Sequence, residues 1–323
     1  MERLKFIGKT IKKVHNEILN TFGKKAYVYR WIHFILFSLR HLSGPDDYFH
    51  MKLYTKSSYE IKNYITLERV FRLRRKNNKK EAIELLNNKV NFCKLYPEYI
   101  KRSYIDVDNS SIDEINSFLD KNESFMCKPK TGMQGQGVIK LIQTEYKKRE
   151  DVLSKIIGQG YILEEVITQH EMLNKLNPNS VNTVRIAVFR KNENVYIIGA
   201  VLKTAIDSVS DNLATGGTAM SVDIETGITF TKGSSYFSNE EYMFHPVTGT
   251  LLVGFQIPFW SEVIEMVTEL TKKIHDLRWV SWDVAITPNG PCIVEGNHNG
   301  DQCIIQYLDQ KGKYKLVKEI NNQ

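Results

Sequence analysis

The residues with the clearest chemical potential are two carboxylates and an amide near the end of the chain. Asp283 and Glu295 lie on two expected strands, 280–286 and 292–295, which a short turn joins. If these strands pair as a hairpin, the carboxylates lie side by side, and strand alternation places Asn297 on the same face as Glu295. Three hard oxygen donors suit Mg2+, which takes its other ligands from water and substrate phosphates. A polar hairpin rim is the alternative, but Asp283 interrupts an apolar strand, where a buried acid needs a partner or a metal.

Lys128 and the glycine-rich segment 132–137 form a second candidate site, for phosphate groups. Backbone N–H groups of such a loop can approach phosphates closely, and a lysine on the preceding strand adds positive charge there. The segment is not a P-loop, because no Gly-Lys-Ser/Thr opens a helix, and it is not a dinucleotide fingerprint, because a strand follows. An ordinary hairpin turn is the alternative interpretation.

Three further segments carry polar residues at the ends of expected strands. Glu164 and Glu165 could accept hydrogen bonds from a ribose while backbone groups contact adenine, although paired acids at a strand end are most often solvated. Arg185 enters an apolar strand two residues after Thr183, and its fork of donors suits a phosphate or carboxylate, or equally a structural salt bridge. The segment 211–217 (DNLATGG) is either a ligand-contacting loop or a flexible connector.

These residues require three successive regions to position them. Residues 1–104 are expected to be mainly helical, because apolar residues recur there at helical spacing. Residues 105–167 are expected to form a small lobe, with strands at 124–128, 138–142 and 161–167 and a helix at 144–157. Residues 168–323 form the remaining, strand-rich lobe, with expected strands at 183–189, 195–204, 219–223 and 228–231, a helix at 260–277 and the hairpin described above.

Composition and charge exclude several classes of protein. With 42% hydrophobic and 25% charged residues, the chain is not intrinsically disordered. The net charge of +7 includes a basic run between residues 62 and 102, which is either a solvated helix face or a surface for an anionic partner; no nucleic-acid motif accompanies it. The longest apolar run, 31–39, is far shorter than the ~20 residues that span a bilayer. Residues 6–39 could form basic amphipathic helices, for which core packing is favoured and loose membrane contact is the alternative.

The four cysteines are scattered at positions 93, 127, 292 and 303, without the paired spacing of metal ligands. Such thiols are typical of a reducing compartment, so we expect a cytoplasmic protein, with the inner face of the membrane as the alternative location.

The order of these motifs resembles the ATP-grasp superfamily, which includes D-alanine–D-alanine ligase and glutathione synthetase. A closer resemblance is to the sugar-transfer-associated ATP-grasp family, predicted to act in cell-surface polysaccharide synthesis. Three segments carry it: 164–189 (EEVITQHEMLNKLNPNSVNTVRIAVF), 211–217 and 283–297 (DVAITPNGPCIVEGN), within a similarity that runs from about residue 40 to 305. One departure is Thr183, because glutamate-adding ligases of the superfamily usually carry an Asp two residues before the strand arginine.

The resemblance implies an α+β ATP-grasp fold, with two α+β lobes clasping ATP after a helical N-terminal region. It implies that ATP is contacted by Lys89, Lys128, Gly132, Gln134, Gly135, Gly137, Glu164, Glu165 and Val166. It also implies that Asp283, Glu295 and Asn297 bind Mg2+ and that Arg185, Lys203 and Asn212 act in catalysis. The substrate would be contacted by His170, Asn182, Gly216 and Gly217; for His170 a structural role is the alternative.

The activity that the resemblance implies is ATP- and Mg2+-dependent ligation of a carboxylate to an amine through an acyl phosphate. The carboxylate substrate would be a sugar or uronic acid of cell-surface polysaccharide synthesis, and the protein would contact the membrane-associated assembly peripherally. Two alternatives are a kinase of a sugar or lipid-linked intermediate and a non-catalytic nucleotide-binding subunit.

Overall fold

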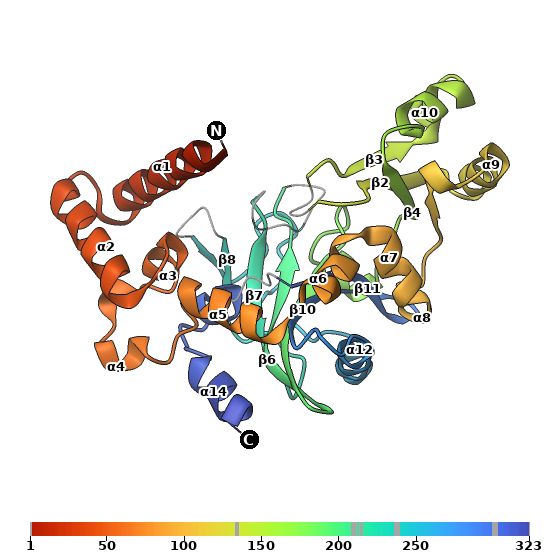
Figure 1. The fold of residues 1–323 in the computed structure, drawn as a ribbon. Helices are drawn as coiled ribbons and strands as arrows, with labels where there is room; N and C mark the ends of the chain where they lie inside the picture. Colours follow the sequence, from red (N-terminus) through yellow and green to blue (C-terminus); the bar gives the residue numbers. More distant parts are fainter. Residues whose placement is uncertain are drawn as a thin grey trace.

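The N-terminal third of the chain is helical in the computed structural model, which describes residues 2–132, 136–207, 211, 213, 216–235, 240–298 and 303–322. This confirms the helical character expected before residue 100. The elements are α1 (Glu2–Phe22), α2 (Tyr27–His41), α3 (Pro45–Phe49), η1 (Leu53–Thr55), α4 (Ser58–Ile61), α5 (Leu67–Asn77), α6 (Lys80–Asn87), α7 (Lys89–Leu95) and α8 (Pro97–Ile100). Helices α1 to α4 form one cluster at the edge of the molecule, and α5 to α8 lead from it toward the small sheet (Figure 1).

A four-stranded antiparallel sheet follows, in the strand order β1-β4-β2-β3. Its strands are β1 (Tyr104–Asp106), β2 (Ser124–Pro129), β3 (Ile139–Ile142) and β4 (Tyr161–Glu165). Phe125 and Leu163 point from this sheet into a core that α9 (Ile112–Lys121) and α10 (Arg149–Ile156) cover with Phe118 and Val152. The short turns η2 (Val107–Asn109) and η3 (Gln143–Glu145) complete this part.

The rest of the chain is built on a seven-stranded antiparallel sheet in the order β11-β10-β5-β6-β7-β8-β9. The strands are β5 (Thr183–Lys191), β6 (Asn194–Thr204), β7 (Thr218–Val222), β8 (Gly233–Ser235), β9 (Glu241–Tyr242), β10 (Trp279–Thr287) and β11 (Gly290–Asn297). The helices of this part are α11 (Glu171–Asn174), α12 (Trp260–Lys273), α13 (Ile304–Tyr307) and α14 (Tyr314–Asn322).

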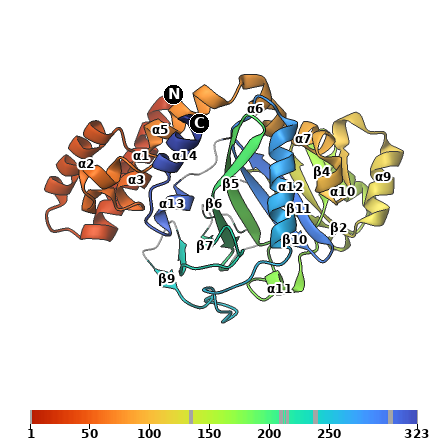
Figure 2. The same cartoon turned by 90° about the horizontal axis from the view of Figure 1, so that it is seen from below.

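Helix α12 lies along one face of this sheet (Figure 2). Ile186 of β5 and Trp282 of β10 point into the core that includes Val267 of α12. Their neighbours Ala187 and Trp279 instead belong to the core on the other face, beside α13 and α14. Because strand side chains alternate between faces, Arg185 and Asp283 lie on the face opposite α12.

The helical N-terminal region contacts the C-terminal segment at α13. Gln306 accepts a hydrogen bond from the backbone N–H of Ile65 at 2.8 Å and donates one to its carbonyl at 3.2 Å. The N-terminal helices therefore pack on the C-terminal segment as well as on the sheet. Among the described residues, every helix is too short or too polar to cross a bilayer.

The expected α+β class and the expected strand pairs are confirmed, with three local differences. Strand β1 was not anticipated, because three residues are too few for a recognisable period. The expected strand 228–231 forms only isolated bridges, at Ile228 and Thr229. The expected helix 144–157 is the turn η3 followed by α10. The boundaries proposed for the three regions stay predictions.

Candidate functional site

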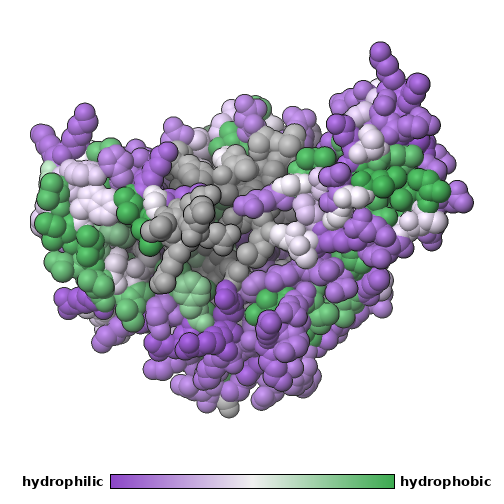
Figure 3. Space-filling view, turned by 45° about the horizontal axis from the view of Figure 1, so that its top comes forward, coloured by the Kyte–Doolittle hydropathy of each residue, from purple (hydrophilic) through white to green (hydrophobic). Residues whose placement is uncertain are grey.

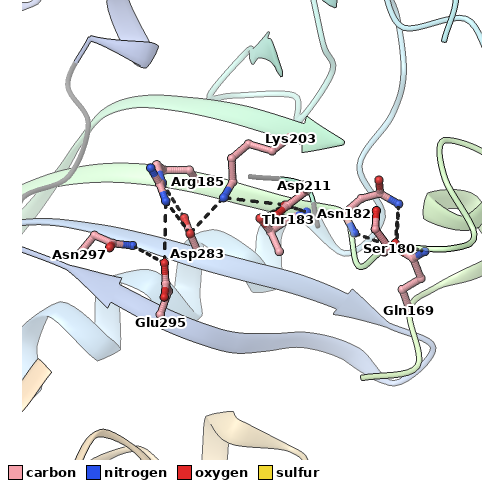
Figure 4. A network of polar contacts seen from close by, with 10 residues as sticks. All are labelled: Gln169, Ser180, Asn182, Thr183, Arg185, Lys203, Asp211, Asp283, Glu295 and Asn297. Carbon is pink, nitrogen blue, oxygen red and sulfur yellow. Dashed lines mark hydrogen bonds and ion pairs between the residues drawn. The ribbon is translucent and has the colours of Figure 1, made fainter. Parts of the chain in front are cut away.

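Charged side chains from four neighbouring strands meet on the open face of the large sheet (Figure 4). Asp283 of β10 lies opposite Glu295 of β11 in one direction and opposite Arg185 of β5 in the other. Lys203 of β6 lies opposite Thr183, two residues from Arg185. The predicted hairpin between 280–286 and 292–295 is thus confirmed, and its two carboxylates lie side by side.

Asp283 is the centre of this group. Arg185 donates from Nε and Nη2 to the two carboxylate oxygens of Asp283, each at 2.7 Å, and Lys203 Nζ donates to Oδ2 at 3.1 Å. The carboxylate is buried, with 4% of its side chain exposed. Burial by itself would raise the pKa of Asp283, but the charges of Arg185 and Lys203 hold it well below its usual range. Asp283 is therefore a carboxylate that stays ionised and fixed in position.

Glu295 and Asn297 have a different environment. The Glu295 side chain is half exposed, and its Oε1 accepts a hydrogen bond from Asn297 Nδ2 at 3.0 Å. Arg185 Nη2 lies 3.9 Å from the same oxygen. Partial burial and the negative charge of Asp283 raise the pKa of Glu295. Among the described residues, clusters of three or more His, Cys, Asp or Glu that could hold a metal do not occur, so the predicted magnesium set depends on the amide of Asn297.

Asp211 joins the group from the segment between β6 and β7. Its Oδ2 accepts hydrogen bonds from the backbone N–H of Thr183, at 2.9 Å, and from the Thr183 hydroxyl, and it lies 3.8 Å from Lys203 Nζ. Burial raises the pKa of Asp211. Asp211 was not among the predicted site residues, although its position in the candidate ligand-contacting segment 211–217 could have indicated it. The neighbouring Asn212, predicted to be catalytic, lies outside the described residues.

A second charged group lies on the small sheet around Glu164. Lys128 Nζ and Arg102 Nε each lie 2.7 Å from Glu164 Oε2, and all three side chains are largely buried. Burial would raise the pKa of Glu164, but Lys128 and Arg102 lower it to about 2. Arg102 also donates from Nη1 to the carbonyl of Ile293 on β11, at 2.7 Å, so it connects the two sheets. Sequence reasoning missed Arg102 because it ends a basic run of similar residues.

Lys89 lies between the two charged groups. The side chain of Asn88 accepts hydrogen bonds from the first turn of α7, which fixes the start of that helix, and the backbone N–H of Lys89 donates to the carbonyl of Lys130 at 2.9 Å. Lys89 Nζ lies 3.3 Å from the carbonyl oxygen of Gly132. Burial lowers the pKa of Lys89; the charges of Glu295 and Glu164 oppose this effect, and that of Lys128 adds to it.

The glycine segment begins beside Lys89. Gly132 and Gly137 have φ values of 134° and 72°, a region that favours glycine, and a Cβ on Gly137 would come within 2.9 Å of the Pro129 side chain. Gln134 and Gly135, predicted to contact ATP, lie outside the described residues. Gly216, with a φ of 94°, and the buried Gly217 come directly before β7. Strand β7 pairs with β6, where Lys203 lies opposite Ala219.

Other predicted residues make their own contacts within the protein. His170 Nδ1 accepts from the backbone N–H of Met172 at 3.1 Å and caps α11. Asn182 is fully buried, and its Nδ2 donates to Gln169 Oε1 at 2.9 Å, away from Asp283 (Figure 4). Glu165 is exposed and accepts hydrogen bonds from Ser103, and Val166 follows directly after β4. Their roles in binding stay predictions.

Comparison with known families gives one match, to the model described as sugar-transfer-associated ATP-grasp, over residues 68–322. Curated proteins gave no match. The fold is similar to N5-carboxyaminoimidazole synthetase from Staphylococcus aureus solved with ADP (13% identity, TM-score 0.45, covering 73% of this chain and 54% of that one). It is similar to the ATP-grasp ligase PsnB solved with a minimal precursor, Mg and ADP (12% identity, TM-score 0.48, covering 79% and 65%). It is also similar to D-alanyl-alanine synthetase A from Vibrio cholerae (13% identity, TM-score 0.47, covering 76% and 67%).

This chain thus spans 54% to 67% of the length of these three solved chains. With such low identities and TM-scores, the comparisons with solved structures carry no argument about activity.

Proposed function

The chain belongs to the sugar-transfer-associated ATP-grasp family, and from this premise we propose that it is an ATP- and Mg2+-dependent carboxylate–amine ligase. The reaction would proceed through an acyl phosphate. The carboxylate substrate would be a sugar or uronic acid used in the synthesis of cell-surface polysaccharide. The family match supports use of ATP, and the charged groups of the two sheets support the roles argued below.

The observation that carries this proposal is the ion pair of Arg185 with Asp283, supported by Lys203. It sets two cations around a carboxylate whose pKa they lower, on neighbouring strands of one sheet. Phosphoryl transfer requires mainly positioning and charge stabilisation, and fixed charges supply both without reorganisation during the reaction.

The group around Lys128 fits the phosphates of ATP. Lys89, Lys128 and Arg102 carry three positive charges against the one negative charge of Glu164. Burial already disfavours the charged form of Lys89, as its lowered pKa indicates, so a bound anion would compensate a charge that the protein only partly balances. The glycines that begin and end the 132–137 segment let its backbone approach such an anion.

The donor set of β10 and β11 fits Mg2+. Glu295 offers a half-exposed carboxylate whose charged form the folded protein disfavours, and Asn297 lies against it with an amide. Asp283 would join them on the same face of the hairpin. Bound there, Mg2+ would neutralise phosphate oxygens of ATP and orient them.

In the first step, an oxygen of the substrate carboxylate forms a bond to the γ-phosphorus of ATP. The bond from that phosphorus to its bridging oxygen breaks, and ADP leaves with the electron pair. Arg185, held in one orientation by Asp283, and Lys203 would stabilise the negative charge on the transferring phosphoryl group.

In the second step, an amine nitrogen attacks the carbonyl carbon of the acyl phosphate. The bond from that carbon to the phosphate oxygen breaks, inorganic phosphate leaves, and the nitrogen loses a proton to water, which leaves an amide. Asn212, Gly216 and Gly217 are proposed to line the acceptor side, and Glu165 and Val166 the adenosine side.

The test is to incubate the purified chain and Mg-ATP with pools of uronic acids, amino acids and amines, following phosphate release and new product masses together. Phosphate release that requires both an acid and an amine, with a mass equal to their sum less water, supports the ligase. A stable phosphorylated product without an amine would assign a kinase instead. Tight ATP binding without turnover across the whole panel would assign a non-catalytic nucleotide-binding subunit. Glu193→Gln is the matched control for Asp283→Asn, because Glu193 is an exposed acid in the turn between β5 and β6 and belongs to neither charged group.

A further inference from the structure

Helix α2 carries large apolar side chains on its inner face and also on its outer face. Its inner face carries Trp31, Phe34 and Phe37, which pack with Val14 of α1 and Tyr48 of α3 in the core of the N-terminal helices. A helix at the surface of a soluble protein normally has a polar face opposite this apolar stripe. The outer face of α2 instead carries mostly apolar side chains, with Arg40 near its C-terminal end.

Large apolar side chains occupy that outer face in contact with water. They recur at helical spacing, and the two outermost, Val28 and Leu39, are each 69% exposed. One group of hydrophobic residues covers the left edge of the molecule, where α1 to α3 lie, and another lies at the right (Figure 3). We call this set the α2 stripe: Val28, Tyr29, Ile32, Ile35, Leu36, Leu39 and Leu42. A contiguous exposed patch of this kind marks an interaction surface.

The stripe lies in the part of the chain that carries its excess positive charge. Residues 1–42, which include α1 and α2, contain nine Lys and Arg against two Asp and Glu, a net charge of +7. The formal net charge of the whole chain is also +7, so the other 281 residues are neutral overall. Of the two acids, Glu17 is largely buried beside His50.

Cations also border both ends of the stripe. Exposed Lys24 and Lys25 precede α2. At its other end, a cavity of about 440 Å3 is lined by Leu42 of the stripe and by Arg40, Lys62, Arg69 and Arg72, among others. Arg72 is paired with Glu68, whereas Arg40 and Lys62 form no ion pair with any described residue. The exposed α2 stripe thus ends at a cavity that is lined mainly by cationic side chains.

We propose that α2 lies on the surface of a bilayer that contains anionic lipids, with the α2 stripe among the acyl chains and the flanking cations at the headgroups. Apolar area and electrostatic attraction to anionic lipid act together in such binding. With 15 residues, α2 is about 22 Å long, shorter than the ~30 Å hydrocarbon core, so it lies along the interface.

The positive charge around the α2 stripe disfavours a second copy of the chain as its binding partner. Packing two α2 stripes together would bring two regions of net charge +7 into contact, and an antiparallel pair would set Lys24 and Lys25 near Arg40 of the other copy. Anionic headgroups instead complement these cations. The proposal is independent of the ligase activity, because none of these residues belongs to the candidate active site.

The test is flotation of the full chain with vesicles of phosphatidylcholine alone and of phosphatidylcholine mixed with phosphatidylglycerol. We expect flotation with the mixed vesicles, weakened by salt.

The triple variant Ile32→Ser/Leu36→Ser/Leu39→Ser should bind at least about tenfold more weakly. Lys24→Gln/Lys25→Gln/Arg40→Gln should lose the preference for phosphatidylglycerol. The matched control is Phe244→Ser/Val247→Ser, which removes two similarly exposed apolar side chains elsewhere and should float like the wild type.

The fold of each variant is checked separately by its urea midpoint and its ATP affinity. Neither quantity should change, because all the replaced side chains are exposed. A blue shift of Leu36→Trp fluorescence on mixed vesicles would place the stripe in an apolar medium. Wild-type chain that stays unbound, or a stripe variant that floats like the wild type, would overturn the proposal. A dimer in light scattering that the stripe variant converts to a monomer, without binding to vesicles, would assign the stripe to a second copy instead.

Discussion

Arg185 donates to both carboxylate oxygens of Asp283 across the β5–β10 register, with Nε and Nη2 each 2.7 Å from its acceptor. Fork-to-fork pairs of this geometry are among the strongest polar contacts in proteins, and they fix both partners in orientation. The pair is buried, so each charge depends on the other for solvation. The carboxylate proposed to bind Mg2+ and the guanidinium proposed to stabilise the phosphoryl group are therefore one structural unit.

Asp283→Asn should abolish Mg2+-dependent ATP turnover and also lower stability. The amide cannot neutralise Arg185 and Lys203, and a buried charge left without its partner costs about 3 kcal/mol of unfolding free energy. Turnover with the cognate substrates and urea unfolding measure the two effects, and circular dichroism checks the fold. Wild-type turnover in this variant would remove Asp283 from the proposed metal site.

Glu295→Gln should separate binding from stability. Because partial burial and Asp283 raise the pKa of Glu295, the folded protein disfavours its charged form, and removing that charge should not lower the unfolding free energy. Mg2+ affinity should fall nonetheless, because a carboxylate ligand is lost. Calorimetric titration of Mg2+ in the presence of a non-hydrolysable ATP analogue measures the affinity. A variant with unchanged Mg2+ affinity contradicts the assignment.

Lys89→Met should weaken ATP binding by roughly tenfold or more, because a charge-assisted hydrogen bond to phosphate contributes about 1.5–3 kcal/mol. Its effect on stability should be small, since burial disfavours the charge of Lys89 in the folded protein. Lys130→Met is the control: Lys130 pairs with Asp106 and Asp108 and should leave ATP affinity unchanged. Equal effects of the two changes on ATP affinity would count against a specific role for Lys89.

The parts of the site that could be predicted from the sequence are the local ones. Asp283 and Glu295 are twelve residues apart on strands joined by one turn, so their juxtaposition follows from a hairpin and from an acid that interrupts an apolar run. The pairing of Lys203 with Asp283 joins residues 80 apart. The resemblance to a family implied a catalytic role for Lys203, but the contact with Asp283 was not predicted.

Arg102 could not be identified in this way. Its partner Glu164 is 62 residues away, and the basic run from 62 to 102 contains many similar candidates. Which face of α2 is buried could not be predicted either. The hydrophobic periodicity of the sequence shows apolar residues on both faces and does not distinguish the buried face from the exposed one. Only packing against Val14 and Tyr48 distinguishes them.

The acid stability of the protein should depend on Glu164. Lys128 and Arg102 lower its pKa from the ordinary 4.5 to about 2, despite its burial. A carboxylate with a lowered folded-state pKa contributes stability that is fully present above its unfolded-state pKa and is lost as pH falls through the folded-state value. The contribution of Glu164 should therefore disappear between about pH 4.5 and about pH 2.

Glu164→Gln tests this window. At neutral pH the variant should be less stable by about 3 kcal/mol, because Arg102 and Lys128 lose their buried counter-charge. As pH falls toward 2, the wild-type carboxyl becomes protonated and resembles the amide, so the two unfolding free energies should converge. Urea unfolding of both proteins across this range measures the gap, with Glu68→Gln as the control, since Glu68 forms a more exposed pair with Arg72. A gap that stays constant with pH would mean that Glu164 stabilises the fold through its shape and hydrogen bonds and not through its charge.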